Sequence, residues 1–452
     1  MAILLSVKKH LSLGREWLWL MWIVALVVRI AFFICFSSVG DRAWLCYDSQ
    51  QYHDRALHLI EHKALTPVES SQKAYRLPGY PQFLACCYAL EKNSVLFALL
   101  VQIVLSSLIP LLVFLLARAL FPLLPVLAYI AGWVACLHVG LIIFAGMLAT
   151  ETLAVLLLLL LLLVLLARAP TMVLAGSLLG FLSLLRPVGH YLLVLIALWI
   201  WYEWRSLRSV GLFVGGWLIV VLPWLVRNLV LVGGICFHTL PGMHFLQYSA
   251  AAVVMQHEQK TYLQARAQLL KAWDNEVDKK ALEQGYPVTE YQRCVLGEKL
   301  AGGIVLAHPW YACKHALTEL IKTLCALHTT QVVIADVGGW PVYTAQTTWA
   351  EKIRYNLAPP LKTPWLWPLI YLDVFVTLSI LFFSFIGLLA LVVRRRLQSR
   401  QALCVLMAGL LWGVTIAYGC ARLRLPFEPI MIIIGVYGVD QIWLWLQGCK
   451  SS

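Results

Sequence analysis

Two carboxylates lie beside apolar stretches of the chain, where a charged group is costly. Asp48 opens the string YDSQQYHDRALHLI, in which Asp48, Tyr52 and Ala56 recur every four residues and would share one helix face. Glu151 opens the run ETLAVLLLLL, with Thr150 before it as a candidate helix cap. A carboxylate at the start of such a run costs on the order of 2–3 kcal/mol unless it is paired or functional. These two acids are therefore the first candidates for chemistry.

Several arginines fall at the ends of the same apolar stretches. They occur in the strings YRLPGYP, LLRPVG, PWLVRN and CARLRLPFEP, as Arg76, Arg186, Arg227, Arg422 and Arg424. The planar guanidinium group suits bidentate capture of a phosphate, and a lipid phosphate would lie at that depth. The alternative is that these arginines only anchor helix ends by extending toward the headgroups. For Glu151, the alternative is a buried structural ion pair with one of them.

The composition indicates the solvent in which these residues work. Of 452 residues, 61% are hydrophobic and 13% are charged, and the mean hydropathy is +0.80. A soluble domain has about half apolar and a quarter charged residues, so a lipid bilayer is the main solvent here. The net charge of +13 does not indicate nucleic acid, because the cations lie at the ends of apolar segments rather than in one patch.

The apolar segments predict an all-α polytopic membrane protein with about ten transmembrane helices. A hydrocarbon core of about 30 Å requires roughly 20 apolar residues in a helix. The predicted spans are 17–37, 94–117, 122–145, 150–167, 171–185, 187–203, 209–226, 365–393, 401–419 and 426–447. Basic residues fall at every second boundary, which the positive-inside rule makes cytoplasmic.

This topology divides the chain into five segments. Residues 1–37 form a cytoplasmic N-terminus and the first span, and 38–93 a first large exoplasmic loop. Residues 94–226 hold spans two to seven. Residues 227–362 form a second large exoplasmic loop, large enough for a small cap, and 363–452 hold the last three spans and a cytoplasmic C-terminus. Within the second loop, helices are expected around 255–300 and 309–328, the latter amphipathic and lying on the membrane.

The twelve cysteines do not predict a zinc site, because no CxxC pair or Cys/His cluster has metal-ligand spacing. Pairing among Cys236, Cys294, Cys313 and Cys325 stays open if the large loop faces an oxidising compartment. His58 and His62 have the spacing of a metal-chelating pair, but a third ligand is not evident in the sequence.

Seven strings in a fixed order resemble the GT-C superfamily of glycosyltransferases. They are YDSxxYxxxA, RLPGYPxFLA, TETLAxLLLLL, LLRPVG, LPWxxRN, HPWYA and ARLRLPFEP, and the resemblance runs from about residue 17 to 440. More narrowly, the chain resembles bacterial relatives of the protein O-mannosyltransferases and of the lipid A aminoarabinose transferases.

The resemblance implies an inverting transfer of a sugar from a polyprenyl-phosphate donor. Asp48 would be the catalytic carboxylate and would accept the proton of an acceptor hydroxyl or amine. Glu151 matches the acidic position of the second exoplasmic loop and would orient the acceptor, hold an arginine or help to bind a metal. Arginines or a divalent cation would stabilise the leaving phosphate. Tyr52 and Tyr80 would either contact the sugar or form an interfacial belt.

The chain also departs from the relatives. Asp48 is followed by Ser49, so the Asp-Glu pair of eukaryotic protein O-mannosyltransferases is absent, and no WWDYG string or C-terminal soluble domain supports an oligosaccharyltransferase. The acceptor therefore stays open between a protein, lipid A and another glycan. In a bacterium the donor would carry undecaprenyl phosphate, and the site would face the periplasm from the inner membrane.

Two other functions compete with the transferase. A transporter or flippase for a lipid-linked sugar would also place arginines at the interface, but would carry polar residues at mid-membrane depth. The predicted spans are nearly pure Leu, Val and Ile, which favours interfacial chemistry. A scaffold subunit with a degenerate site would tolerate loss of the two carboxylates.

Overall fold

The structure is a computed structural model that describes residues 15–37, 48–67, 70–337, 359, 361–394 and 397–448. Every regular element in these ranges is helical, and no strand occurs there. The fold class predicted from the apolar periodicity is confirmed.

Six apolar helices or helix pairs among the described residues are long enough to cross a bilayer. They are α2 (Arg15–Ser37), α5 (Val95–Ser107) with α6 (Ile109–Leu120), α12 (Leu207–Val232), α20 (Leu366–Val393), α21 (Ser399–Gly413) with the 3₁₀ turn η3 (Val414–Ala417), and α23 (Glu428–Gly448). A residue stripe along α20 has helical spacing and is exposed; it comprises Phe375, Leu378, Phe382, Phe385 and Leu389. Such a continuous apolar surface requires lipid, so the protein is an integral membrane protein.

The remaining predicted spans are shorter or bent. Helix α7 (Pro125–Cys136) and the segment of α8 (Val139–Ile143) with η1 (Phe144–Gly146) meet at 52°. Three helices are 10 to 17 residues long: α9 (Glu151–Leu165), α10 (Met172–Leu185) and α11 (Val188–Trp204). All ten predicted segments are thus helical, but six have the length of a straight span, or seven if this bent pair is one span; a second bent pair outside the ten segments brings the total in the described residues to at most eight.

Close backbone approaches hold the bundle together. A Cβ atom added at Gly176 of α10 would lie 1.9 Å from the carbonyl oxygen of Phe213 in α12, and one at Gly216 would lie 2.2 Å from that of Val173. Between membrane helices the lipid supplies little driving force for association, so small residues that allow backbone contact stabilise the interface. Helices α20 and α23 pack in the same way at Gly387, beside the carbonyl oxygen of Ile434.

One bent pair was not predicted to enter the bundle. Helix α17 (Pro309–Cys325) turns by 88° into α18 (Thr330–Val337), whose residues Val332, Val333 and Ile334 are buried. The turn is fixed because Arg424 donates hydrogen bonds to the carbonyl oxygens of Leu324 and Ala326. The predicted amphipathic helix over 309–328 therefore continues into the protein core.

The remaining helices belong to the two long loops. The first loop supplies α3 (Ser49–His62) and α4 (Gly79–Leu90). The second supplies α13 (Leu240–His244), the π-helical segment η2 (Phe245–Ala250), α14 (Ala251–His257), α15 (Tyr262–Gln284) and α16 (Glu290–Ala307). Helices α15 and α16 begin with capping boxes at Thr261 and Thr289, which satisfy their first N–H groups.

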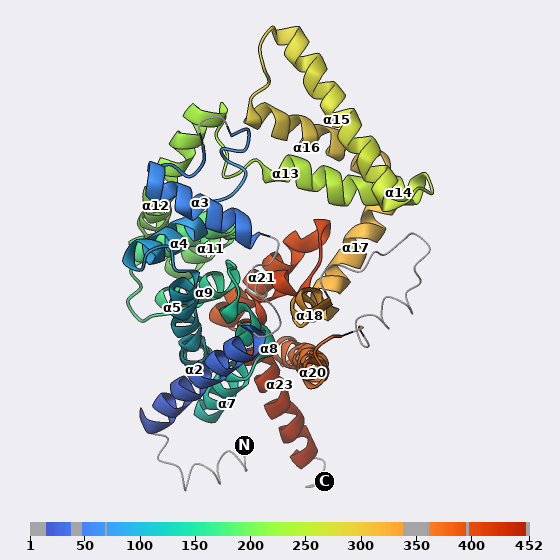
Figure 1. Cartoon of the computed structure of the whole chain (residues 1–452). Coiled ribbons are helices and arrows are strands. Elements are labelled where there is room, and N and C mark those ends of the chain that lie inside the picture. The colour runs from blue at the N-terminus through green and yellow to red at the C-terminus, as the bar shows by residue number, and fades with distance from the viewer. Residues whose placement is uncertain are drawn as a thin grey trace.

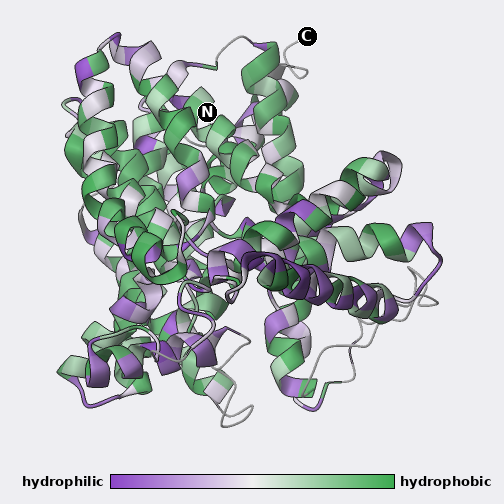
Figure 2. Cartoon of the chain, turned by 90° about the horizontal axis from the view of Figure 1, so that it is seen from above, coloured by the Kyte–Doolittle hydropathy of each residue, from purple (hydrophilic) through white to green (hydrophobic). Residues whose placement is uncertain are grey.

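The second loop has a hydrophobic core of its own, separate from the bundle, which includes Leu246, Ala250, Leu269, Trp273 and Ala301. Figure 1 shows α15 and α16 projecting at one end of the molecule, opposite the start of α2 and the end of α23. In Figure 2 the bundle is mostly hydrophobic, whereas α15 carries many hydrophilic residues. The four cysteines considered for pairing, Cys236, Cys294, Cys313 and Cys325, have free thiols.

Candidate active site

Asp48 lies directly before the first turn of α3, where two arginines from other segments meet it. Arg76 donates a hydrogen bond of 2.5 Å to Oδ1, and Arg422 donates one of 2.9 Å to Oδ2. Arg422 belongs to the short helix α22 (Ala421–Arg424). The Asp48 side chain is 23% exposed, so it remains open to a ligand on one side.

Glu151 lies at the first position of α9 and is fully buried. It accepts a hydrogen bond of 2.9 Å from Arg186 and another from Nε of Arg422. Arg422 therefore contacts both carboxylates through one guanidinium group, and the N-terminus of α9 adds a favourable dipole. We call Asp48, Arg76, Glu151, Arg186 and Arg422 the rim cluster.

A buried network fixes the backbone between the two carboxylates. Gln102 of α5 donates to the carbonyl oxygens of Phe144, Ala145 and Met147, at 3.1, 3.0 and 2.7 Å. Ser49 Oγ donates a hydrogen bond of 2.7 Å to the carbonyl oxygen of Leu148. The start of α3 is thereby tied to the segment that leads into Glu151.

The two tyrosines predicted to contact the sugar support this network from below. The Tyr80 hydroxyl donates to Gln102 Oε1 at 2.8 Å, and the Tyr80 ring meets Tyr52 edge to face at 5.1 Å. Both rings are buried. The Arg76 guanidinium lies 5.8 Å from the Tyr52 ring centroid. The geometry thus places Tyr52 and Tyr80 beneath the rim cluster, and their contact with a sugar stays a prediction.

Arg227 lies outside the rim cluster. It donates to Asn228 Oδ1 at 2.8 Å and to the Lys73 carbonyl oxygen at 3.3 Å, and its guanidinium lies 4.5 Å from the Trp224 ring centroid. Lys73 precedes Arg76 by three residues. Arg227 therefore helps to hold the segment that carries Arg76, and these contacts do not reach Asp48.

Arg424 also lies apart, although only one residue separates it from Arg422. It pairs with Glu428 at 2.5 Å and lies among His138, His328 and Asp373. Asp373 accepts hydrogen bonds from Thr329 and faces His328 at 3.2 Å. All five are at most 2% exposed. We call His138, His328, Asp373, Arg424 and Glu428 the buried cluster.

The buried cluster corrects two expectations. Arg424 was expected at the membrane interface, either beside the donor phosphate or as an anchor of a helix end, but its side chain is buried in the bundle against Glu428. It also described the spans as nearly free of ionisable residues, whereas Asp373 of α20 and Arg29 of α2 are buried inside helices. Arg29 is held by Ser106 at 2.8 Å and by the carbonyl oxygen of Cys136 at 3.3 Å.

Four further aromatic side chains line one side of the rim cluster, and of these only Tyr75 was considered from the sequence, as a residue that packs around the sugar or belongs to an interfacial belt. The Tyr75 ring lies 5.2 Å from the Arg76 guanidinium. His244 contacts Tyr248 at 5.1 Å, and Tyr248 contacts Tyr418 at 4.9 Å between ring centroids. Tyr248 lies in η2, and π-helical turns occur often at functional sites. We call Tyr75, His244, Tyr248 and Tyr418 the aromatic wall.

The charges around Asp48 decide its protonation state. Burial disfavours the carboxylate, but the guanidinium groups of Arg422 and Arg76 outweigh that effect and hold the pKa of Asp48 below its ordinary value of 3.8. For His244, burial and then Arg76 lower the pKa to about 4. At neutral pH the site therefore presents an ionised Asp48 beside a neutral His244.

A metal site does not form from the described residues. No group of three His, Cys, Asp or Glu side chains is placed to hold an ion there. His58 and His62 have ring centroids 4.5 Å apart, and His58 already bonds the Ala64 carbonyl oxygen at 2.6 Å. Asp48 and Glu151 both form ion pairs with arginines. The cations that the described residues bring to this site are the guanidinium groups of Arg76, Arg186 and Arg422.

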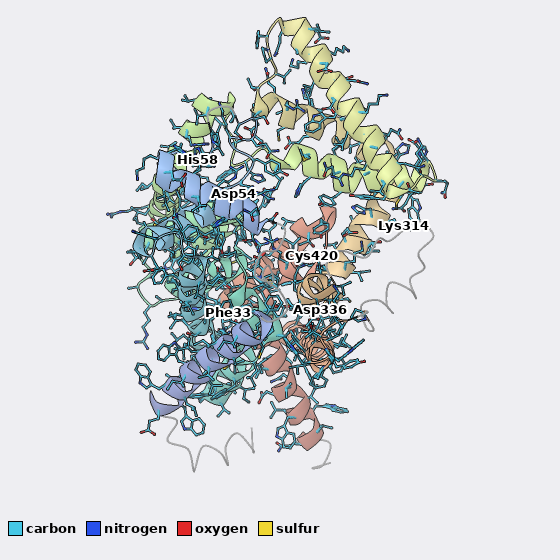
Figure 3. The ribbon with its side chains drawn as sticks, viewed as in Figure 1. Phe33, Asp54, His58, Lys314, Asp336 and Cys420 are labelled. Atoms are coloured by element: carbon cyan, nitrogen blue, oxygen red, sulfur yellow. The ribbon has the colours of Figure 1, made fainter. Side chains whose placement is uncertain are left out.

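The rim cluster draws on segments far apart in the sequence. In the view of Figure 3, Cys420, directly before α22, lies between α3, which carries Asp54, and α17, which carries Lys314. Arg422 thus reaches Asp48 from a segment 374 residues away.

Neither the family models nor the curated proteins searched match the sequence. Among solved structures, the apo oligosaccharyltransferase of Archaeoglobus fulgidus superposes with a TM-score of 0.50 at 13% identity, over 97% of this chain and 52% of that one. Its complex with an inhibitory peptide and a dolichol-phosphate gives a TM-score of 0.53 at 12% identity, over 98% and 52%. The apo ArnT of Cupriavidus metallidurans gives 0.39 at 15% identity, over 95% and 78%.

The two superpositions with the oligosaccharyltransferase share the helical architecture across nearly the whole of this chain. The chain therefore shares the helical fold of these oligosaccharyltransferase chains, and it spans about half of their length.

Proposed function

We propose that this protein is a membrane glycosyltransferase that moves a sugar from a polyprenyl-phosphate donor to an acceptor at the membrane surface. The observation that carries the proposal is the rim cluster, in which Arg422 bridges Asp48 and Glu151 between Arg76 and Arg186. One carboxylate of this pair is partly open and the other is closed. An open acid beside several guanidiniums suits proton transfer next to a phosphate.

The charge of the rim cluster matches such a donor. Three guanidiniums and two carboxylates leave one positive charge. A polyprenyl-phosphate sugar is a phosphodiester with one negative charge, so its binding neutralises the cluster. The released polyprenyl phosphate carries close to two negative charges at neutral pH. Protonation of Asp48 during the reaction removes one negative charge from the protein and keeps the complex neutral.

The reaction follows from this arrangement. An acceptor hydroxyl or amine attacks the anomeric carbon, and the bond from that carbon to the phosphate oxygen breaks with its electron pair leaving on the phosphate. The acceptor proton passes to Asp48, which acts as the general base. Arg76 and Arg422 stabilise the charge that develops on the phosphate. Single displacement inverts the anomeric configuration.

Glu151 has a different task from Asp48. It is fully buried and is held by Arg186 and Arg422, so no acceptor reaches it. We assign to Glu151 the orientation of Arg422, which keeps one edge of that guanidinium fixed while the other edge meets Asp48. The sequence left open whether Glu151 forms a structural ion pair or has a functional role. In this assignment its ion pair with Arg422 serves that role.

The aromatic wall supports binding of a sugar ring beside Asp48. Aromatic faces contact the C–H groups of a pyranose, and an offset ring contact is worth about 0.5–1.5 kcal/mol beyond buried area. Tyr75, Tyr248 and Tyr418 are partly exposed, which leaves ring surface available to a ligand. The neutral His244 adds a hydrogen-bonding group that does not repel the cationic cluster.

The proposal is tested by donor turnover. Purified protein in detergent would be given radiolabelled polyprenyl-phosphate sugars and an acceptor panel of peptides, lipid A and glycans, with and without EDTA. Wild type should release polyprenyl phosphate and Asp48→Asn should not. Asp54→Asn is the matched control, because Asp54 is exposed on the same helix α3 and accepts a hydrogen bond of 2.7 Å from Gln50 rather than from an arginine. Turnover by Asp48→Asn at the wild-type rate would sink the proposal.

A transporter is the second candidate, because the buried cluster places ionisable residues inside the bundle as a transporter would. Each of the five members of that cluster is paired with at least one other member, and all are buried. Such mutual pairing suits a structural core better than a translocation path. Lipid-linked sugar crossing proteoliposomes without any glycosidic product would reverse this ranking.

A further inference from the structure

A glutamate of the second long loop holds the segment that carries Arg76. Glu290, the first residue of α16, accepts a hydrogen bond of 2.7 Å from the N–H of Lys73 and one of 3.2 Å from that of Ala74. It also accepts one from the Thr239 hydroxyl, while the Thr239 N–H donates to the Ala74 carbonyl oxygen at 3.0 Å. Lys73 and Ala74 lie three and two residues before Arg76.

A second glutamate of the same loop holds the segment that carries Arg422. Glu319 of α17 is buried and accepts a hydrogen bond of 2.8 Å from the N–H of Gly419, three residues before Arg422. A Cβ at Gly419 would lie 2.0 Å from the Glu319 carbonyl oxygen, so this contact requires glycine. Next to it, the Thr323 hydroxyl donates to Thr415 at 2.8 Å.

The two contacts have the same chemistry. In each, a carboxylate from the loop over 227–362 accepts hydrogen bonds from backbone N–H groups two to three residues before an arginine that binds Asp48. Hydrogen bonds to a charged acceptor are about twice as strong as neutral ones. These backbone groups lie only two or three residues before each arginine. Holding the backbone there therefore restricts the position of the arginine side chain.

We propose that Glu290 and Glu319 are positioning residues, which set Arg76 and Arg422 on Asp48 and so place the charges of the rim cluster under the control of the second long loop. This inference rests on the proposed function, because it assigns the two glutamates to the chemistry of Asp48. Neither glutamate touches Asp48 or a reacting atom. Each acts through the arginine that follows the backbone N–H groups to which it is hydrogen-bonded.

The pH dependence of turnover distinguishes positioning from mere stability. The charged and titratable groups around Asp48 are Arg76, Arg422, Glu151, Tyr52, Tyr75, His244 and Tyr248. Among the described residues, Arg76 and Arg422 form the ion pairs with its carboxylate. Loosening either arginine leaves the burial cost in place, so the Asp48 pKa rises. The acid limb of kcat/KM then moves to higher pH, whereas a purely structural defect lowers the amount of active protein and leaves the limb in place.

The substitutions are Glu290→Gln and Glu319→Gln. An amide has one acceptor oxygen and no charge, so the Lys73 and Ala74 N–H groups keep at best one neutral acceptor, and the bond from Ala74 to the second oxygen is lost. We expect kcat to fall about tenfold with little change in KM for the donor, as for loss of an interaction made in the transition state. The acid limb should move upward, and Glu290→Asp, which keeps two acceptor oxygens, should restore part of both. Glu298→Gln is the control, because Glu298 is exposed on the same helix α16.

Hydrogen exchange gives a readout that does not need turnover. In Glu290→Gln the amides of Lys73 and Ala74 should exchange faster while Gly419 is unchanged, and Glu319→Gln should show the reverse. Exchange at the wild-type rate in both variants would show that the two glutamates do not hold these backbone segments. If wild type turns over no donor, the proposed function fails while exchange still tests the contacts. An active wild type with an unmoved acid limb and unchanged kcat in Glu290→Gln overturns the positioning role alone.

Discussion

Arg422 and Arg424 of α22 are separated by one residue, and they belong to two clusters that differ in their exposure to solvent. Arg422 meets Asp48 at the partly open rim, with its other edge on Glu151. Arg424 enters the buried cluster, where Glu428 and several backbone carbonyls surround it. Both clusters pair arginine with Asp and Glu carboxylates, although the buried cluster also contains two histidines, and the clusters differ in their exposure to solvent. Ion pairs that a ligand reaches can exchange partners during a reaction, whereas sealed ion pairs fix the arrangement of helices.

The largest effect is expected at the rim from Asp48→Asn. The amide keeps the shape of the side chain but accepts no proton, so kcat/KM should fall by about 10²–10⁴, the usual contribution of a general base. Turnover of a labelled donor measures this loss. Asp54→Asn should stay at the wild-type rate, and a similar loss in both variants would move the effect from the carboxylate to α3 as a whole.

In the buried cluster, Arg424→Met should damage stability rather than chemistry. Removal of one partner leaves Glu428 charged inside the bundle, which costs about 3–5 kcal/mol. Thermal unfolding in detergent should therefore shift strongly downward, while turnover per folded molecule at low temperature changes little. The double variant Arg424→Met with Glu428→Gln should recover part of the loss, since the two side chains pair with each other. Unchanged unfolding in Arg424→Met would show that the two clusters do not differ as described.

Arg422→Lys tests whether one guanidinium must bridge the two carboxylates. A lysine keeps the charge but lacks the planar fork that reaches Asp48 and Glu151 together. Loss of one charged hydrogen bond, worth roughly 1.5–3 kcal/mol, predicts about a 10- to 100-fold fall in kcat/KM. Steady-state kinetics with a purified donor measure it. Wild-type kinetics in the lysine variant would show that charge alone is sufficient.

The pH profile separates the two arginines of α22 further. The pKa of Asp48 lies below 3.8, so the base is present above that pH and is lost as the pH falls through the depressed pKa. In Arg422→Gln only Arg76 remains to offset the effect of burial, so the pKa of Asp48 should rise. The acid limb of kcat/KM should therefore move to higher pH. An Arg424→Gln variant should leave the limb in place. Equal movement in both would contradict the separation of the clusters.

The smallest effect is expected at the aromatic wall. Tyr248→Ala removes one ring from η2, which predicts about a 3- to 10-fold rise in KM for a contact of roughly 0.5–1.5 kcal/mol. Tyr286→Ala is the control, because Tyr286 is exposed beyond the end of α15. A fall in kcat with constant KM would instead place Tyr248 against the reacting atoms.

The sequence predicted the membrane class, the helical segments and five residues that meet in the rim cluster, because each of these leaves a local signal. Arg424 was misplaced because α22 has four residues, and the direction of a side chain on so short a helix is set by its neighbours. Glu290 and Glu319 were missed for another reason. They bind backbone N–H groups, which are the same in every residue, so no pattern of side chains marks their targets.

The Leu-rich helix α9 was predicted as part of a transmembrane span over 150–167, and its sequence is uniformly apolar after Thr152. In the structure none of its residues is exposed. This follows from its position at the centre of the bundle, where its neighbours α5, α6 and α10 surround it. The helix is also shorter than a hydrocarbon core is thick, because its 15 residues span about 22 Å.

The buried position of α9 has an electrical consequence for the site that it carries. Directly behind Glu151, residues such as Val155, Leu158 and Leu162 form a dry layer of low polarisability. Field lines from the surplus positive charge of the rim cluster do not spread into such a layer and are focused toward the open side, where Asp48 lies. An anionic headgroup drifting in the plane of the bilayer would feel this field before contact. The helix with no polar residue beyond its first turn thus sets the direction from which a charged lipid is drawn in.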